Sequence, residues 1–480
     1  MPSKCSATRK SAPLTSASKT EDTFSCGAGE GARLIENMPP PHIPPTLGAM
    51  NNVVAAPVAT PGTFRFLHAA DLHIDSPLRG LSRYAGAPVE RLRNATRRAL
   101  ENLVDLALAE RVHFVLLAGD LYDRDWPDFH TGLFFRAQMV RLGRADIAVY
   151  IVQGNHDAQG TITRELVLPD NVKIFSSRKA ETARIDALGV AIHGHSFPHR
   201  EVPEDLVPHY PDALPGQFNI GVLHTSLTGA SGHDTYAPTD IPTLKTKGYD
   251  YWALGHVHTR AVVCESPRVV FPGNLQGRHA NETGPKGCEL VSVVNGQMDA
   301  RFVALDVVRW QQMTVSLDGL DNLAQASQTI TAALAQATLG AGDRLHALRI
   351  HLTGRTTLHT TEAEQPGTLE AAVHAAAQDV AGAELWIEQV QLQLSSPIDR
   401  TALAQGDDAV AELLRLVDSL AADPAALAAW TAQACGDVLH KLPAEAKGEG
   451  HWHDPDTLKA LLMDAESTLL ARLAGSGSGV

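Results

Sequence analysis

Short apolar runs alternate with longer segments of helical periodicity from Phe64 onward. Each run ends in polar residues or glycine, which is the pattern expected of βαβ units. The runs predict strands at Phe64–Ala70, His113–Ala118, Ala148–Gln153, Val190–Gly194, Asn219–Leu223 and Tyr251–Leu254. Apolar residues spaced along one helical face predict a helix over Val89–Glu110, and a second helix is predicted over Phe129–Leu142.

The pattern changes after Gly255. Short runs suit antiparallel strands that complete a sheet, at Ala261–Glu265, Val269–Phe271, Glu289–Val294 and Met298–Val307. A small α+β domain is predicted next, with strands at Gln312–Leu317, Leu345–Leu352 and Leu385–Leu394 and helices near Asn322–Ala337 and Leu369–Val380. Residues 408–474 read as helices broken at Asp423-Pro424 and through Pro443–Pro455. We therefore divide the chain into residues 1–62, 63–310, 311–400 and 401–480.

Residues 1–62 show neither helical nor strand periodicity and are rich in Ser, Thr, Pro, Ala and Gly, so we expect a disordered tail. A start codon placed too early is an equally simple explanation, because Met50 opens a shorter frame. We expect no secretory signal and no membrane attachment, since no apolar run is long enough for either. The five dispersed cysteines form no CxxC pair, and we expect a cytoplasmic protein.

The net charge of −14 is unevenly distributed. Residues 306–480 hold 23 acidic and 10 basic residues, a net of −13, so the first 305 residues are close to neutral. An acidic C-terminal part argues against non-specific nucleic-acid affinity driven by overall charge. A phosphodiester substrate would meet the near-neutral part, where bound divalent cations would add positive charge.

Metal-type ligands follow five of the predicted strands. The motifs, in chain order, are Asp71-Leu72-His73, Gly119-Asp120-Leu121-Tyr122-Asp123, Gly154-Asn155-His156-Asp157, His224 and Gly255-His256-Val257-His258. Ligands gather at the carboxyl ends of strands in open α/β sheets. A mixed Asp, His and Asn set suits manganese, iron or zinc better than calcium or a structural zinc site. The number of ligands fits two ions that share one carboxylate, an arrangement that activates water and binds phosphate.

Together these motifs resemble the signature of the calcineurin-like metallophosphoesterases. The flanking segments Phe-Leu-His-Ala-Ala-Asp-Leu-His, from Phe66, and Gly-Asn-Leu-Gln-Gly-Arg-His-Ala-Asn-Glu, from Gly273, are similar to the SbcD/YhaO-type DNA-repair nucleases of this superfamily. The resemblance covers about residues 64–310. It implies a four-layer αββα domain, followed here by the small α+β capping domain and a helical C-terminal segment.

The resemblance also implies a role for each ligand. Asp71, His73, Asp120 and His258 would hold the first ion, and Asp120, Asn155, His224 and His256 the second. His156 would contact the phosphate and protonate the leaving oxygen, with Asp157 as its orienting neighbour or as a support for the loop. Asp123 stands where some relatives carry a histidine that helps exonuclease action, so cleavage polarity is not inferred from it.

The implied function is metal-dependent hydrolysis of DNA, as exonuclease, endonuclease or both, in repair or recombination. Manganese is the first expectation for the two divalent ions, with iron, zinc and magnesium as alternatives. The implied partners are an SbcC-like or YhaN-like coiled-coil ATPase, bound through the acidic helices, and a second copy of the chain. A small-nucleotide phosphodiesterase, a phosphoprotein phosphatase and a regulatory subunit of an ATPase complex remain alternatives, because one ligand set serves several functions.

Other polar and aromatic groups have simpler interpretations. His193 and His195 are expected to be structural, the His451-Trp452-His453 group to be a solvated turn, and the tryptophans at 310, 386 and 430 to pack in cores. A loop with His233, Asp234 and Tyr236 is a weaker candidate for substrate contact. The arginines at 79, 83, 91, 93, 97 and 98 suit either a phosphate backbone or a salt-bridged helix face.

Overall fold

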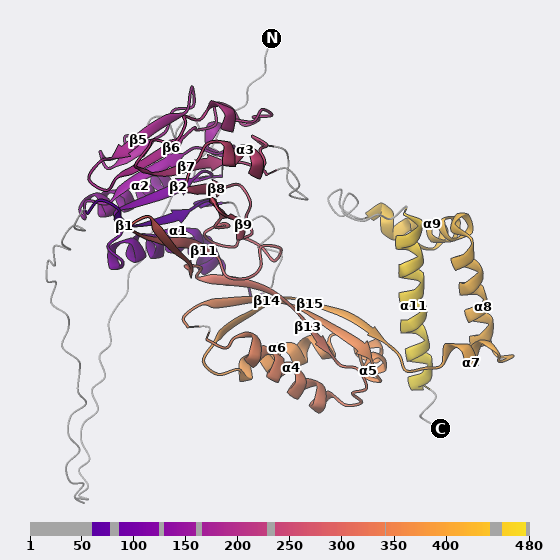
Figure 1. The fold of residues 1–480 in the computed structure, drawn as a ribbon. Coiled ribbons are helices and arrows are strands. Elements are labelled where there is room, and N and C mark those ends of the chain that lie inside the picture. The colour runs from indigo at the N-terminus through magenta and orange to yellow at the C-terminus, as the bar shows by residue number, and fades with distance from the viewer. Residues whose placement is uncertain are drawn as a thin grey trace, which may run out of the picture. The chain divides into compact units, whose positions relative to one another are not determined.

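The computed structural model describes residues 60–76, 86–123, 129–159, 166–227, 236–340, 342–441 and 454–476. Most of the expected tail, residues 1–59, lies outside these ranges. The first sheet has the order β12-β11-β1-β2-β3-β4. Strands β1 to β4 run parallel, β11 runs antiparallel to β1, and β12 runs antiparallel to β11. Figure 1 labels β1, β2 and β11 of this sheet. Its strands are β1 (Thr63–Ala69), β2 (Phe114–Ala118), β3 (Ala148–Val152), β4 (Val172–Ile174), β11 (Gly287–Val294) and β12 (Gln297–Ala304).

A second six-stranded sheet has the order β5-β6-β7-β8-β10-β9. Strands β6, β7, β8 and β10 are parallel, and the edge strands β5 and β9 run antiparallel to their neighbours. The strands are β5 (Glu181–Ile185), β6 (Val190–Gly194), β7 (Phe218–His224), β8 (Tyr251–Gly255), β9 (Ala261–Glu265) and β10 (Arg268–Phe271). The runs after Gly255 therefore complete two sheets, because β9 and β10 join the second sheet whereas β11 and β12 join the first.

Helices cover the outer face of each sheet. Helices α1 (Val89–Ala109) and α2 (Phe129–Gly143) pack on the first sheet, and α3 (Ile241–Thr246) with the 3-10 helix η4 (Val207–His209) packs on the second. The two sheets bury a shared core in which the rings of Phe66 and Phe114 stack at 5.0 Å. Each fully buried phenylalanine contributes about 1.5–3 kcal/mol of hydrophobic stabilisation. The expected αββα layers are confirmed.

The sequence pattern located most elements within one or two residues but missed the short or half-exposed ones. Strands β4 and β5 and the short helices α3, α5 (Leu358–Glu364) and α7 (Arg400–Ala404) were not predicted. Strands β4 and β5 lie at the sheet edges, and most of their residues are only partly buried. A strand of this kind lacks the clear alternation of apolar and polar residues that identifies a half-buried strand.

The middle domain has a three-stranded sheet, β13-β14-β15, that is parallel throughout. The elements are β13 (Val308–Ser316), α4 (Leu323–Ala337), β14 (Leu345–Arg355), α5 (Leu358–Glu364), α6 (Thr368–Asp379) and β15 (Glu384–Ser395). Asn322 caps α4 by accepting a hydrogen bond from the backbone N–H of Gln325. Helices α4 and α6 pack on the sheet and supply the crossovers that parallel strands require.

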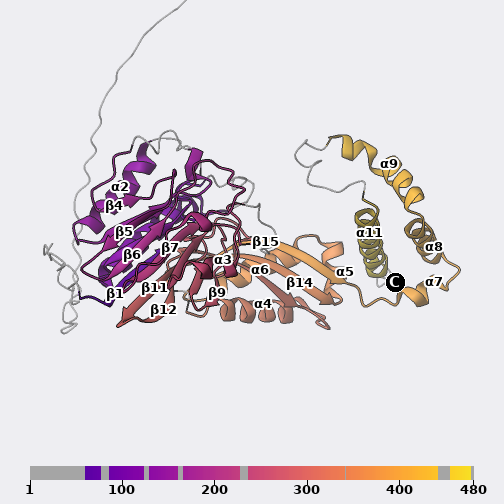
Figure 2. The same ribbon diagram turned by 45° about the horizontal axis from the view of Figure 1, so that its top comes forward.

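The C-terminal segment consists of α7 (Arg400–Ala404), α8 (Ala409–Ala422), α9 (Pro424–Lys441) and α11 (Pro455–Ser476) (Figure 2). The expected break at Pro424 is present, and Asp408 caps α8. Arg400 pairs with Glu466 of α11 and with Asp418 of α8. The expectation that Trp430 packs in a core was wrong, since this side chain is exposed on α9. Among the described helices, none combines the length and apolar character needed to cross a membrane.

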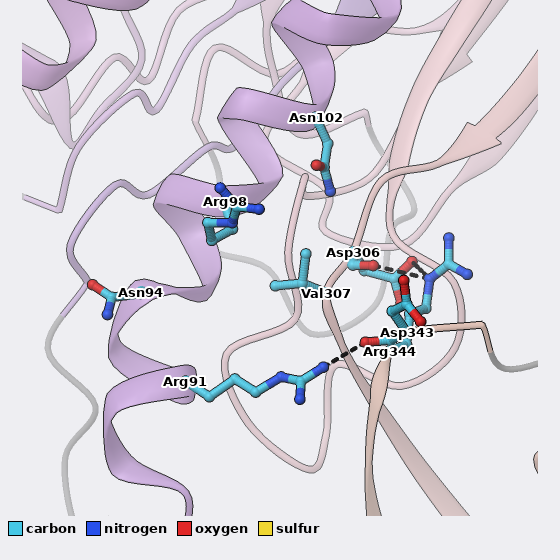
Figure 3. A pocket seen from close by; sticks show the side chains of 8 residues that line it. All are labelled: Arg91, Asn94, Arg98, Asn102, Asp306, Val307, Asp343 and Arg344. Atoms are coloured by element: carbon cyan, nitrogen blue, oxygen red, sulfur yellow. Dashed lines mark hydrogen bonds and ion pairs between the residues drawn. The ribbon is translucent and has the colours of Figure 1, made fainter. Parts of the chain in front are cut away.

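A polar pocket lies where α1 meets the middle domain (Figure 3). It is lined from α1 by Arg91, Asn94, Arg98 and Asn102, and from the other side by Asp306, Val307, Asp343 and Arg344. Arg91 donates to the backbone oxygen of Asp343 and pairs with Glu384. Arg97 pairs with Asp75, and Arg98 with Glu101. The ion pairs of these three arginines fit the interpretation as a salt-bridged helix face. Arg79 and Arg83 lie outside the described residues.

Candidate metal centre

All of the expected ligands follow or end strands at one edge of the two packed sheets. Asp71 and His73 follow β1, Asp120 follows β2 and Asn155 follows β3, while His224 ends β7 and both His256 and His258 follow β8. The ligand atoms of six of these residues gather in two groups, in which the atoms lie within 4.8 Å of one another. The first group is Asp71, His73 and His258, and the second is Asp120, His224 and His256. A third group of the same kind, His73, Asp123 and His156, overlaps the first at His73. The structure thus brings together residues that are far apart in the sequence.

The first group contains two imidazoles that face each other. The Nε2 atoms of His73 and His258 lie 3.1 Å apart. The Nδ1 atom of His73 lies 2.6 Å from Asp123 Oδ1, and that of His258 lies 2.8 Å from Glu282 Oε1. Each carboxylate favours the tautomer that carries its proton on Nδ1, which leaves a lone pair on Nε2. Two lone pairs this close to one another repel, so the pair suits a site at which both nitrogens would bind the same cation.

The second group is backed by the main chain. His224 donates from Nδ1 to the carbonyl oxygen of Ala118, 2.9 Å away. Its Nε2 atom lies 2.9 Å from Asn155 Oδ1 and 3.5 Å from Asp120 Oδ2. Burial alone would lower the pKa of His224, but the Asp120 carboxylate raises it to about 9. This buried cluster therefore favours positive charge, as a cation site should.

Four ligand-bearing residues adopt left-handed backbone conformations. The φ angle is 51° at Asp71, 43° at His73, 52° at Asp120 and 105° at His256. Such conformations cost on the order of 1–3 kcal/mol for a residue with a side chain. The chain after β1 is held against the chain after β2, because the Asp71 and His73 N–H groups donate to the oxygens of Gly119 and Asp120. The Asp71 carboxylate in turn accepts from the His256 N–H.

Three glycines leave space for the ligands. A Cβ atom at Gly154 would lie 2.3 Å from Asp120 Oδ1, and one at Gly255 would lie 1.8 Å from the oxygen of Ala118. At Gly119 a Cβ atom would meet His224 Nδ1 at 2.4 Å, and this residue also has a φ of 93°. The structure shows a positive φ only at Gly119 and close approach at all three.

His156 and Asp157 occupy different environments. The His156 side chain is 29% exposed, and its Nδ1 atom lies 3.3 Å from Asp123 Oδ1. Asp157 is buried and accepts from the N–H groups of Leu121, Tyr122 and Gly154. Asp157 therefore supports two ligand-bearing loops, which was one of its two expected roles. The carboxylate beside His156 is Asp123 rather than Asp157.

Two residues of the site were missed by sequence reasoning. Glu282 contacts Nδ1 of His258, and Arg278 pairs with both Glu282 and Asp123. Burial would raise the pKa of Glu282, but hydrogen bonds from His258 and Arg278 hold it well below its ordinary value. Both residues lie in the Gly-Arg-His-Ala-Asn-Glu segment that carried the family resemblance. The sequence of that segment could therefore have pointed to both residues, although it was used only to support the family resemblance.

The remaining candidates take structural positions. His193 is buried, stacks on Tyr249 at 4.4 Å and contacts Asn219 Oδ1. His195 is buried beside Tyr210. The structural interpretation of both histidines is confirmed.

The loop candidates and the tryptophans are placed as follows. Tyr236 packs edge-on against His256, with the ring centres 5.4 Å apart. His233, Asp234 and the group at 451–453 lie outside the described residues. Trp310 and Trp386 are buried as expected.

Two regions of the chain match family models. Residues 64–260 match the family model of calcineurin-like phosphoesterases, and residues 310–395 match that of the middle domain of the metallophosphoesterase YhaO. The uncharacterized metallophosphoesterase YhaO of Bacillus subtilis (strain 168) is 38% identical over 269 residues. The match covers 55% of this chain and 66% of that relative, just under two thirds of its length.

Solved structures show weaker likeness. A dimetal phosphatase from Danio rerio is 13% identical, with a TM-score of 0.33. The match covers 50% of this chain and 96% of the phosphatase chain. GAP50, the anchor in the inner membrane complex of Plasmodium, is 12% identical, covers 51% and 85%, and has a TM-score of 0.30.

Proposed function

From the premise that the chain carries a calcineurin-like phosphoesterase domain and a YhaO-type middle domain, we propose that it is a two-metal phosphodiester hydrolase that acts on DNA. The observation that carries the proposal is the pair of adjacent ligand groups at one edge of the sheets. Two groups of mixed Asp and His ligands are what a two-ion centre requires. These groups support the hydrolysis chemistry, and they do not by themselves identify the substrate.

The ligands divide between two ions in this proposal. Asp71, His73 and His258 hold the first and His224, His256 and Asn155 the second, with Asp120 shared between them. When bound, the ions supply positive charge that attracts a phosphate and lowers the pKa of water. Manganese is the proposed metal, since imidazole, carboxylate and amide ligands suit borderline divalent ions.

His156 is proposed to donate a proton to the leaving oxygen. Its side chain is more exposed than those of Asp120 and His224, so it can reach a bound phosphodiester. Its backbone N–H donates to Asp120 Oδ1 at 3.0 Å, which fixes the histidine beside the shared ligand. Burial lowers the pKa of His156, and the carboxylates of Asp120 and Asp123, the latter 3.3 Å from Nδ1, oppose this shift by favouring the protonated ring.

The support for DNA as substrate is the resemblance of the segments around Asp71 and Arg278 to those of SbcD/YhaO-type nucleases. By the same analogy, the C-terminal helices would bind an SbcC-like or YhaN-like coiled-coil ATPase, the chain would form a homodimer, and it would act in the cytoplasm in repair or recombination. The acidic helices α8, α9 and α11 are the proposed docking segment for that ATPase.

A substrate panel tests the proposal. The full chain with Mn²⁺ is offered linear duplex DNA, single-stranded DNA, a cyclic nucleotide and a phosphopeptide, with Asp120→Ala as the inactive control. We expect turnover of DNA that Asp120→Ala lacks. Turnover of the cyclic nucleotide or phosphopeptide with inert DNA would replace the nuclease by a phosphodiesterase or a phosphatase. No turnover of any substrate would favour a regulatory subunit.

A single substitution tests the role of His156. His156→Gln removes the ionisable ring but leaves the proposed ligands in place, so hydrolysis should fall by about 10²–10⁴-fold. The Mn²⁺ content, measured by atomic emission after desalting, should stay near that of the wild type. Loss of both ions in this variant would make His156 a ligand instead of an acid.

A further inference from the structure

The loop Asn274–Lys286, which we name the strap, joins the first ligand group to the middle domain. On one side, Glu282 Oε1 lies 2.8 Å from Nδ1 of His258. The Nζ atom of Lys286 donates to the backbone oxygen of His258 at 2.8 Å. Both the ring and the main chain of this expected ligand are therefore held by the strap.

One arginine of the strap connects the two carboxylates that back the facing imidazoles. Arg278 Nη2 lies 2.7 Å from Glu282 Oε1, and Arg278 Nη1 lies 3.3 Å from Asp123 Oδ2. Glu282 Oε2 also accepts from the Arg278 N–H and from Asn274 Nδ2. Because Asp123 orients His73 and Glu282 orients His258, the guanidinium fixes the relative position of both rings.

The other side of the strap is hydrogen-bonded to β13 of the middle domain. Trp310 Nε1 donates to the oxygen of Gly277 at 3.0 Å, and the Gly284 N–H donates to the oxygen of Trp310 at 2.9 Å. Gln276 Nε2 donates to the oxygen of Val308 at 2.6 Å, and its Oε1 accepts from the N–H of Val307 at 2.9 Å. These bonds span the strap from Gln276 to Gly284.

Aromatic packing extends this contact into the middle domain. The ring of Trp310 packs edge-on against Trp386 of β15 at 5.7 Å. Both rings share a buried cluster with Ala280 of the strap and Leu92 of α1. The middle domain thus packs directly behind the residues that orient His258.

We propose that Arg278 and Glu282 are positioning residues for the metal centre, and that the middle domain, through the strap, sets the affinity of the Asp71–His73–His258 group for its divalent ion. This inference rests on the proposed two-metal centre. Carboxylates that bond to the outer nitrogen of a ligand histidine raise its basicity and hold its ring in place. A change at Trp310, which is no ligand, should accordingly alter metal binding.

Calorimetric titration of the metal-free full chain with Mn²⁺ tests this, with electron paramagnetic resonance of the bound ion as a second readout. Glu282→Gln should weaken one of the two sites by about tenfold to a hundredfold and leave the other unchanged. Trp310→Phe keeps the aromatic ring but loses the bond to Gly277, and it should weaken the same site by a smaller factor.

A matched control separates positioning from general stability. Glu388, like Glu282, is buried and pairs with an arginine, Arg349, but it lies in the middle sheet. Glu388→Gln should therefore leave both Mn²⁺ affinities and the resonance spectrum unchanged. Should Glu282→Gln unfold the chain, as circular dichroism would show, Trp310→Phe decides the question alone.

The outcomes distinguish the two proposals. Wild-type affinity at both sites in Glu282→Gln, or equal losses in Glu282→Gln and Glu388→Gln, would overturn the role of the strap while leaving the hydrolase proposal intact. Weakened Mn²⁺ binding in a chain that cleaves no phosphodiester would retain the strap and reject the hydrolase. A wild-type chain that binds no Mn²⁺ would overturn both.

Discussion

The two ligand groups of the metal centre are built in different ways. In the first, His73 and His258 are oriented by the side-chain carboxylates of Asp123 and Glu282. In the second, His224 is oriented by a backbone carbonyl, that of Ala118 at the end of β2. The first group therefore depends on loop side chains and on the domain behind them, whereas the second depends on how the two sheets pack.

This difference predicts how each group responds to change. A side-chain carboxylate can be replaced without altering the fold, so the first group can be adjusted by single substitutions. A backbone carbonyl cannot be removed by substitution, and it moves only when the sheets move. Substitutions at the first group should change metal affinity, while those at the second should change stability as well.

The largest effect is expected at Asp120, which the two groups are proposed to share. Asp120→Ala removes a ligand of both ions, and the several kcal/mol that metal ions contribute to stabilising the transition state correspond to about a thousandfold loss of phosphodiesterase activity or more. Steady-state kinetics with Mn²⁺ measures this. The exposed Asp299 on β12 provides the control Asp299→Ala, which should retain full activity. Loss of only one ion from Asp120→Ala would show that the carboxylate is not shared.

The backbone-supported group is tested at Gly255. A Cβ atom there would lie 1.8 Å from the carbonyl oxygen of Ala118, so Gly255→Ala should lower the free energy of unfolding by about 2–3 kcal/mol. Urea unfolding followed by tryptophan fluorescence measures the change. Gly436→Ala in α9, where nothing lies within 4 Å, should not destabilise the chain. Unchanged stability of Gly255→Ala would mean that the sheets adjust easily, which contradicts a rigid second group.

The carboxylate-supported group is tested at Asp123. Asp123→Asn weakens the bond that orients His73 but leaves the fold intact, so one Mn²⁺ site should lose about tenfold to a hundredfold in affinity. Calorimetry measures the affinity, and thermal unfolding checks the stability. The control Asp105→Asn loses only an exposed pair with Arg141. A fall in stability as large as that of Gly255→Ala, with normal Mn²⁺ binding, would reverse the comparison.

The smallest effect concerns His68 of β1, a histidine that is buried without being an expected ligand. It contacts the Tyr251 hydroxyl and the Leu254 oxygen, and burial lowers its pKa from 6.5 to about 3. Between pH 6.5 and about pH 3 the unfolded chain therefore binds one proton more than the folded chain does at His68. This difference lowers the free energy of unfolding as the pH falls below about 6.5. Its contribution between pH 7 and pH 5.5 is about 1 kcal/mol.

A non-titrating amide tests this value. His68→Gln can still donate and accept hydrogen bonds, so its unfolding free energy should fall by about 1 kcal/mol less than that of the wild type over the same pH range. Urea unfolding at the two pH values measures the difference. Identical pH dependence in both proteins would contradict this prediction, because it would mean that His68 is protonated in the folded chain. Burial would then not keep this histidine neutral.

Much of this centre could be predicted because its ligands sit next to strong strand signals. Asp71, Asp120 and His224 adjoin buried strands, and their residue types are uncommon in such positions unless they are paired or bind metal. The role of Ala118 could not be predicted, since a backbone carbonyl carries no sequence signal. Glu282 and Arg278 were missed because their contacts depend on how the strap folds back onto His258.

The errors outside the centre have a similar cause. Trp430 belongs to an apolar helical pattern, yet the sequence does not show which face of α9 other elements cover. Burial of Trp310 could be expected from composition, but its bond to Gly277 could not. Local pattern thus predicts elements well, whereas contacts between distant segments require the folded chain.

The left-handed conformations at Asp71, His73, Asp120 and His256 have a consequence for protein engineering. These conformations are maintained by hydrogen bonds between the chain segments that follow separate strands. A short peptide that carries one motif would relax to an ordinary backbone and turn its ligand away. A single motif therefore cannot be transferred to another protein by itself. A graft into another scaffold would have to include β1, β2 and β8 together with the turns that follow them.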